Sequence, residues 1–214
     1  MRNSLHAAVS ILILAGCGGP AGQETETKKQ GNEPKAPPPA EYKVKVDTTK
    51  GVFVIQVHRD WSPTGADHFH RLVSSNFYDG VKFHRVLKQF IAQWGINGNP
   101  QTHQLYAMVR ISDDPPKQKN KRGAVAFAKI GPNSRTTEVF VNLRDNRQLD
   151  ATGFVPFGEV VEGMDVVDSL TYLYGDLAPR GAGPDPIKAQ QVGNVYLERD
   201  FPRLDAIKTA RVVQ

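Results

Sequence analysis

The chain has 214 residues, of which 39% are hydrophobic and 23% charged, so it can build a core and is not wholly disordered. Its net charge is +5, but basic and acidic residues are interspersed along the chain. The two short basic clusters, residues 28–29 and 117–122, have no stacking aromatic residues beside them. We therefore interpret them as solvated loops and expect no nucleic-acid partner.

The N-terminal residues have the pattern of a bacterial export signal. Arg2 supplies a positive start, and residues 7–14 form an apolar run that is too short to span a bilayer. The following stretch, Leu-Ala-Gly before Cys17, resembles the lipobox of bacterial lipoproteins. We expect a signal peptide over residues 1–17, acylation of Cys17 and a membrane anchor, with the folded domain in the periplasm or extracytoplasmic space of the cell envelope. The alternative is an ordinary secretory signal with an incidental cysteine.

Cys17 is the only cysteine, so its acylation leaves the folded part without a disulfide, a cysteine metal site or a cysteine nucleophile. Residues 18–41 contain five prolines and four glycines, and their only apolar residues are alanines. Such a segment cannot bury enough surface to offset the entropy of ordering, which predicts a disordered linker.

From residue 42 the pattern changes to period two, which predicts a hairpin of residues 42–47 and 52–58. Ser62 and Pro63 are a typical helix N-cap and first helical residue, and helical spacing of apolar residues follows them. Short strands are predicted at 82–87, 90–93, 123–128, 139–142 and 154–161, a second helix at 163–174, and a closing strand at 206–213. This mainly-β pattern predicts a closed antiparallel β-barrel of about eight strands capped by two helices.

Three blocks of residues resemble cyclophilin-type peptidyl-prolyl isomerases in type, order and spacing. The first is FHRVLKQFIAQWG at 83–95, the second contains GAVAFA, GPNS and a phenylalanine within 123–140, and the third spans 149–167 with FGEVVEGMDVV. The resemblance implies a cyclophilin-like domain over 42–214, monomeric and without cofactor or metal. It would act as a peptidyl-prolyl cis-trans isomerase on proline-containing client chains and assist the folding of extracytoplasmic proteins. Residues 175–205 match no block; we interpret them as a loop and helix insertion that packs on the barrel or binds a partner.

The resemblance also implies a site. Arg85 is the catalytic cation, and Gln93 lies beside it near the substrate carbonyl. Rotation about an X–Pro bond breaks no bond, so a fixed cationic donor that favours the twisted amide is sufficient chemistry. The implied substrate-binding residues are Phe90, Ile91, Phe140 and Leu149 around the proline ring, Phe154 at the rim, the backbone of Lys129, and Glu138.

Several positions depart from the family pattern. Glu138 stands where glutamine is usual, and we expect it to lie near Arg85 and pair with it, which changes the availability or the orientation of the arginine. Gln148 replaces a tryptophan that some members use to bind cyclosporin-type inhibitors, and Phe154 replaces a frequent histidine. We therefore expect weak inhibitor binding. Glu138 also keeps open an alternative: a catalytically weak cyclophilin-fold module that binds proline-containing segments.

Each site residue has a structural alternative as well. Arg85 is then a surface residue of a strand, Gln93 satisfies a backbone group, and the phenylalanines belong to the core. His84 is expected to be structural, behind the arginine. A solute-binding lipoprotein is a third functional class, which the lipobox permits and the three blocks argue against.

Overall fold

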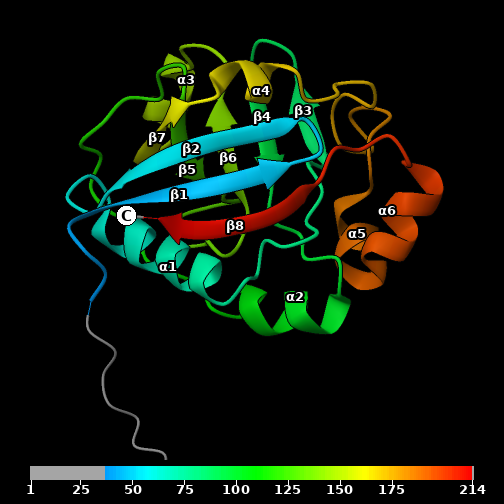
Figure 1. Cartoon of the computed structure of the whole chain (residues 1–214), viewed down its shortest axis with the longest axis horizontal. Coiled ribbons are helices and arrows are strands. Elements are labelled where there is room, and N and C mark those ends of the chain that lie inside the picture. Colours follow the sequence, from blue (N-terminus) through cyan, green and yellow to red (C-terminus); the bar gives the residue numbers. More distant parts are fainter. Residues whose placement is uncertain (1–36, 214) are drawn as a thin grey trace, which may run out of the picture. The chain divides into compact units, whose positions relative to one another are not determined.

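The computed structural model describes residues 37–213 (Figure 1). The predicted signal peptide, the predicted acylation site Cys17 and most of the predicted linker therefore lie outside the described residues. Strands β1 (Glu41–Thr48) and β2 (Gly51–His58) form the predicted antiparallel hairpin. The other elements are α1 (Pro63–Ser74), β3 (Arg85–Leu87), β4 (Ile91–Trp94), α2 (Pro100–Ala107), β5 (Ala124–Phe127), β6 (Val139–Asn142), α3 (Arg147–Ala151), β7 (Pro156–Glu162), α4 (Met164–Asp168), α5 (Pro186–Val192), α6 (Asn194–Asp200) and β8 (Ile207–Val213).

One sheet contains all eight strands, in the order β3-β4-β6-β5-β7-β2-β1-β8, with every neighbouring pair antiparallel. Its two edge strands do not pair with each other. The segment before β3 meets the start of β8 instead, through the isolated bridge Lys82↔Ala206 and backbone hydrogen bonds between residues 80–83 and 205–207. The prediction of eight antiparallel strands is thus confirmed, whereas the sheet is a curled half-barrel rather than a clearly closed barrel.

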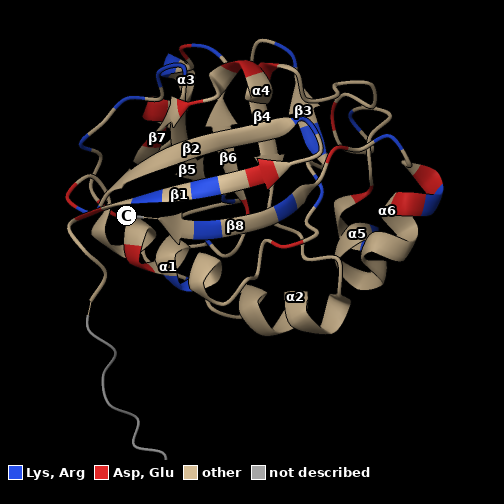
Figure 2. Ribbon diagram, in the orientation of Figure 1, with Lys and Arg blue, Asp and Glu red and all other residues tan. Residues whose placement is uncertain are grey.

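The prediction of two helices is wrong, because the described part of the chain has six. Helix α1 is found where it was predicted, but α4 stops at Asp168 instead of continuing to residue 174. The amide of Thr171 donates to Asp205 Oδ2 at 2.7 Å and so leaves the helical ladder. Helix α2, which carries no charged residue (Figure 2), was not predicted. The sequence nevertheless contains a helix-start signal, an asparagine followed by a proline: the Asn99 side chain accepts the amides of Gln101 and Thr102, and Pro100 is the first helical residue.

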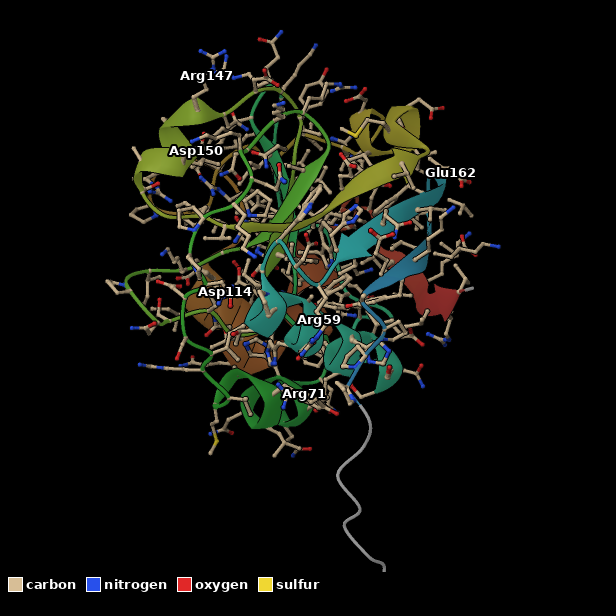
Figure 3. All side chains as sticks on the ribbon, turned by 90° about the vertical axis from the view of Figure 1, so that its left-hand side faces the viewer. Arg59, Arg71, Asp114, Arg147, Asp150 and Glu162 are labelled. Atoms are coloured by element: carbon tan, nitrogen blue, oxygen red, sulfur yellow. The ribbon has the colours of Figure 1, made fainter. Side chains whose placement is uncertain are left out.

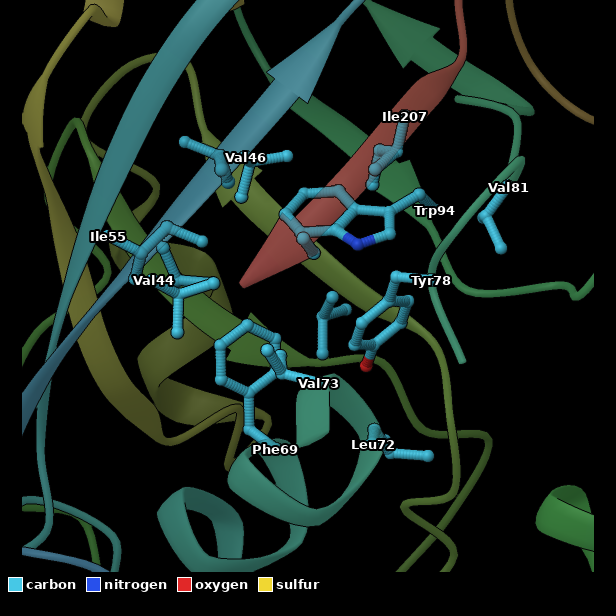
Figure 4. Packing of buried hydrophobic residues seen from close by; sticks show 14 of the residues in the cluster. Val44, Val46, Ile55, Phe69, Leu72, Val73, Tyr78, Val81, Trp94 and Ile207 are labelled. Carbon is cyan, nitrogen blue, oxygen red and sulfur yellow. The ribbon is translucent and has the colours of Figure 1, made fainter. Parts of the chain in front are cut away.

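The large core fills the concave side of the curled sheet. In Figure 1, α1 lies at one end of the sheet and α4 at the other. Figure 4 shows Phe69 and Val73 of α1 on the side of the helix that faces Val44, and these residues are buried together with Leu72 and Trp94. Burial of a large apolar side chain stabilises a fold by about 1.5–3 kcal/mol, so this helix is held by its packing. None of the helices in residues 37–213 is long and apolar enough to cross a membrane.

The start of α1 is capped differently from the prediction. Ser62 makes no side-chain cap; its hydroxyl instead donates to Asp114 at 2.5 Å. The Asp114 carboxylate accepts the amides of Thr64 and Gly65, and Figure 3 shows it beside this end of the helix. Burial raises the pKa of Asp114, but these hydrogen bonds and one from Arg135 outweigh it, so the pKa lies below its ordinary value. The carboxylate stays ionised and ties residues 112–114 to the helix.

A second, smaller core joins the C-terminal part of the chain to Ile96, which follows β4. It contains Ile96, Ala189, Tyr196, Leu197 and Leu204, with Tyr174 and Phe201 packed against it. Helices α5 and α6 meet in this core at Gly193, so the helical part of the predicted insertion consists of two short helices. The segment packs on the sheet domain, as one of the two interpretations predicted, because the Asn194 amide donates to Gly98 O at 2.9 Å and Lys82 pairs with Glu198 at 3.2 Å.

Candidate active site

The register of four strands brings the site together. Arg85 pairs with Gln93 between β3 and β4, Gln93 with Phe140 between β4 and β6, and Phe140 with Ala126 between β6 and β5. Residues that oppose one another across a ladder lie on the same face of a sheet. The four side chains therefore form one row across the sheet.

This row lies on the face opposite the large core. The intervening residues Val86, Ala92, Val141 and Val125 all belong to that core. Ile91, Ala126 and Phe140 form a separate apolar cluster instead, with Phe90, Ala128, Leu149 and Phe154 packed against it. The phenylalanines therefore belong to a cluster apart from the large core, in which Phe140 is buried. Because side chains alternate along a strand, one set points into the large core and the other lines a groove on the opposite face.

A pocket of about 650 Å³ lies over this row. Residues from the C-terminal segment, among them Leu177, Arg180 and Ile187, form a second wall that was not predicted, and α2 contributes His103 and Ala107. Gln148 is exposed and is not part of the lining. All nine residues predicted for the site line the pocket: Arg85, Phe90, Ile91, Gln93, Lys129, Glu138, Phe140, Leu149 and Phe154.

The guanidinium of Arg85 is held from two sides. Its Nη1 donates to Gln93 Oε1 at 3.1 Å, and its Nε donates to Asp176 Oδ1 at 2.6 Å. The side chain is only 15% exposed, and its guanidinium carbon lies 5.9 Å from the centroid of the Phe90 ring. Sequence reasoning missed Asp176, which belongs to the segment whose role was left open.

The charge of Asp176 is favoured by its surroundings. Burial raises the pKa of its carboxyl, but the hydrogen bonds from Arg85 and from the Leu177 amide, with the charges of Arg85 and Arg180, bring the pKa below its ordinary value. The carboxylate is therefore ionised at neutral pH and forms a charge-assisted hydrogen bond with Arg85.

Glu138 does not pair with Arg85, contrary to the prediction. Its Oε2 accepts a hydrogen bond from Gln93 Nε2 at 2.8 Å and lies 3.2 Å from His84 Nε2, without hydrogen-bond geometry to that ring. Glu138 directly precedes β6 and lies two residues before Phe140, the partner of Gln93, so its side chain is on the same face as Gln93. Arg85 already pairs with Asp176. His84 is buried behind the arginine, as expected.

The ionised Glu138 sets the orientation of the Gln93 amide. Burial raises the pKa of Glu138, but the close contact with His84 and its charge, the hydrogen bond from Gln93 and the charge of His103 lower it below its ordinary value. A carboxylate only accepts hydrogen bonds, so the Gln93 amide nitrogen must face it. The amide oxygen is then left to accept from Arg85, and the four polar groups form one chain: Glu138, Gln93, Arg85, Asp176.

A buried asparagine network holds the rim of the pocket. Asn142 Nδ2 donates to Asn120 Oδ1, and Asn142 Oδ1 accepts from Asn146 Nδ2. Asn146 Nδ2 also donates to Phe90 O at 2.8 Å. Asn120 in turn donates to Phe154 O at 2.8 Å. These residues were not singled out from the sequence, because asparagine is common in loops and its pairing here is long-range. They fix the backbone that carries two of the pocket's phenylalanines.

Lys129 lines the pocket, and its backbone groups have no hydrogen-bond partner among the described residues. Its Nζ donates to Asp113 at 2.9 Å and lies 5.9 Å from the centroid of the Phe154 ring. Within residues 37–213, nothing hydrogen-bonds to the Lys129 N–H or carbonyl. Both groups are thus available to the main chain of a bound peptide.

Fold and groove together are those of a protein that holds an extended segment against a fixed cation. The sequence matches the family model described as "Cyclophilin type peptidyl-prolyl cis-trans isomerase/CLD" over residues 43–192. The peptidyl-prolyl cis-trans isomerase of Acinetobacter baylyi is 33% identical over 141 residues, which cover 62% of this chain and 75% of the relative. Peptidyl-prolyl cis-trans isomerase B of Escherichia coli is 30% identical over 169 residues, covering 75% and 92%.

A solved structure shares the fold. The cyclophilin-type isomerase cgd2_1660 of Cryptosporidium parvum superposes with a TM-score of 0.59 at 19% identity and covers 81% of this chain and 98% of its own. The chain belongs to the cyclophilin-type peptidyl-prolyl cis-trans isomerase family, and it is an enzyme of that class.

Proposed function

We propose that this enzyme isomerises X–Pro bonds in client proteins outside the cytoplasm, assisting their folding, with Arg85 as the catalytic donor. The observation that carries this proposal is the row of Arg85, Gln93 and Phe140 on the groove face of the sheet. A hydrogen-bonding cation and an apolar surface lie next to each other there, and a prolyl residue presents a matching amide and ring.

The proposed mechanism uses no covalent chemistry. Amide resonance makes the rotation barrier about 18–20 kcal/mol, and this resonance is lost when the amide twists. The prolyl nitrogen then regains a lone pair that accepts a hydrogen bond. Within the described residues, Arg85 Nη2 donates to no protein group, so it is the nitrogen we assign to this contact. The half-buried site strengthens the interaction by lowering the local dielectric.

Substrate binding is assigned to the remaining predicted residues. The proline ring would rest on Phe90, Ile91, Phe140 and Leu149, with Phe154 at the rim, and the Lys129 backbone would hold the peptide main chain. The Cryptosporidium relative has also been solved in the presence of the dipeptide Ala-Pro, which supports a proline peptide as ligand. The premise of a weakly catalytic binding module, a direct pair between Glu138 and Arg85, is not met by the geometry.

The variant Arg85→Ala tests the mechanism. Loss of a charged donor to the transition state is expected to lower kcat/KM by about 10²–10³-fold, measured on the full-length protein with a proline-containing peptide. Arg59→Ala is the matched control, because Arg59 forms a similar 2.6 Å pair with Asp67 and does not line the pocket. Unchanged activity in Arg85→Ala would remove Arg85 from the mechanism.

We also propose that acyl chains on Cys17 anchor the enzyme to a membrane of the cell envelope. The support is the lipobox-like stretch that follows a short apolar run. Metabolic labelling with a fatty acid tests it: label should enter the wild-type chain and be absent from Cys17→Ser. Equal labelling of both chains, or of neither, would contradict the anchor.

A further inference from the structure

Arg85 is fixed by a residue from outside the motif that contains it. Gln93, in the same motif, holds Nη1, whereas the Nε bond goes to Asp176, 91 residues away. Arginine has a long side chain with many rotamers, so a single hydrogen bond leaves much of its side-chain freedom. Two bonds to different nitrogens define the plane of the guanidinium and the direction of Nη2.

The loop around Asp176 is built to present its carboxylate. Asp176 Oδ1 also accepts the amide of Leu177 at 2.8 Å, and its backbone carbonyl accepts the amide of Gly183 at 2.9 Å. A Cβ at either Gly181 or Gly183 would overlap that carbonyl, so the loop closes around Asp176 only with glycine at both positions. Arg180 Nε, 3.6 Å from the other carboxylate oxygen, adds a weaker contact from the exposed side.

The loop is in turn attached to the small core. Asp185, just after it, caps α5 by accepting the amides of Ile187 and Lys188. The amide of Asp185 donates to the hydroxyl of Tyr196, which is buried in the small core. Asp176 therefore sits on a braced loop between two packed regions.

We infer that Asp176 is a positioning residue that fixes the guanidinium of Arg85 in the orientation the isomerase reaction needs. The inference rests on the proposed role of Arg85. It also gives residues 175–205 a part in catalysis: the small core holds the loop, the loop holds Asp176, and Asp176 holds the arginine. Because Nε and Nη1 are both occupied, Nη2 is directed to the substrate. A donor held in place contributes to catalysis without being reordered in each turnover.

The test compares Asp176→Ala with Asp176→Asn in the full-length protein. The alanine variant is expected to lower kcat about ten-fold with little change in KM, because the arginine is still present but no longer oriented. In NMR spectra, the Hε proton of Arg85 should lose its hydrogen-bonded shift and exchange faster with water. The asparagine variant keeps an oxygen acceptor in the same place, so it should recover most of kcat and much of the Hε signature.

The matched control is Asp79→Ala. Asp79 forms a comparable 2.7 Å pair with Arg211, and neither residue lines the pocket. Its loss should leave kcat and the Arg85 Hε signal unchanged.

Three outcomes overturn the inference: wild-type or higher kcat in Asp176→Ala, a lower kcat with an unaltered Hε signal, or no recovery in Asp176→Asn. Combination with Arg85→Ala separates this failure from that of the proposed mechanism. If Arg85 is catalytic and Asp176 acts through it, Asp176→Ala has no further effect in the Arg85→Ala background. If Arg85→Ala alone is fully active, the mechanism fails, while the Hε signal still reports whether the pair exists.

Discussion

The two walls of the pocket are built in different ways. The first is the outer face of β3, β4, β5 and β6, whose inner face packs on the large core. The second is a loop and two short helices held by a core of five buried residues. In the first wall the same strands form the fold and carry the site residues, so these side chains are anchored on the rigid backbone of the sheet. The second wall has few apolar contacts of its own, and regions of this kind open at lower free energy than the rest of a protein.

The largest effect should come from the core behind the first wall. Phe157 is fully buried on β7, with its ring centroid 4.8 Å from that of Phe69 and 5.2 Å from that of Phe127. Phe157→Ala should lower the free energy of unfolding by about 3–5 kcal/mol in chemical denaturation. Phe201→Ala in the small core should cost less, about 1–2 kcal/mol, because Phe201 is only partly buried. Equal losses would mean that the two cores unfold as one.

A pH effect of slightly smaller size is expected where α1 meets the pocket rim. The guanidinium of Arg71 donates to His68 Nδ1 at 2.9 Å, so Nε2 carries the proton and donates to Thr136 O at 2.6 Å. Burial lowers the pKa of His68 to about 4; the hydrogen bond to Thr136 opposes this, and the charges of Arg71 and Arg135 add to it. The neutral ring is the form that the fold stabilises.

The sign follows from proton uptake. Between pH 6.5 and about 4 the unfolded chain binds a proton at His68 that the folded chain does not, so stability falls as the pH falls through this window. The expected loss is on the order of 2–3 kcal/mol, measured by denaturation at several pH values. His68→Gln keeps a donor and an acceptor in place and should flatten the slope. A smaller slope remains from His103, whose pKa burial also lowers. An unchanged slope would exclude His68 as its source.

Gly193→Ala should open the second wall alone. Gly193 has φ +66°, and a Cβ there would overlap the Gly98 carbonyl, so the change should cost at least about 2 kcal/mol. Hydrogen exchange should rise in α5 and α6 while the strands stay protected. Gly175→Ala is the matched control, since Gly175 has φ +65° and open space around its Cβ position. Its cost should be about 1 kcal/mol. Faster exchange of the strands in Gly193→Ala would show that the walls are not separable.

The smallest effect is expected for Glu138→Gln. A glutamine at this position donates as well as accepts, so the Gln93 amide is no longer held in one orientation and Arg85 Nη1 loses its acceptor part of the time. We expect kcat/KM to fall by about two- to three-fold in the peptide assay. A faster variant would restore the first interpretation, in which Glu138 restrains Arg85.

Local pattern explains what the sequence predicted well. Period-two alternation reports which side of a strand is buried, and it placed β1, β2 and most of the other strands. The motif at residues 83–95 encodes one hairpin, in which Arg85 and Gln93 oppose each other by register. Eight of the nine site residues lie on or beside the strands of one sheet, and Leu149 reaches the same pocket from α3.

Only the tertiary structure decided the contacts between distant segments. Asp114 caps a helix whose cap residue lies 52 positions away, and Asp176 reaches Arg85 across 91. Neither carboxylate lies in a periodic pattern, so nothing near it in the chain indicates its partner. The family of the enzyme, its strands and its central arginine could be predicted from the sequence. The partners of that arginine depend on packing, because a charged side chain takes the nearest opposite charge that the folded chain brings within reach.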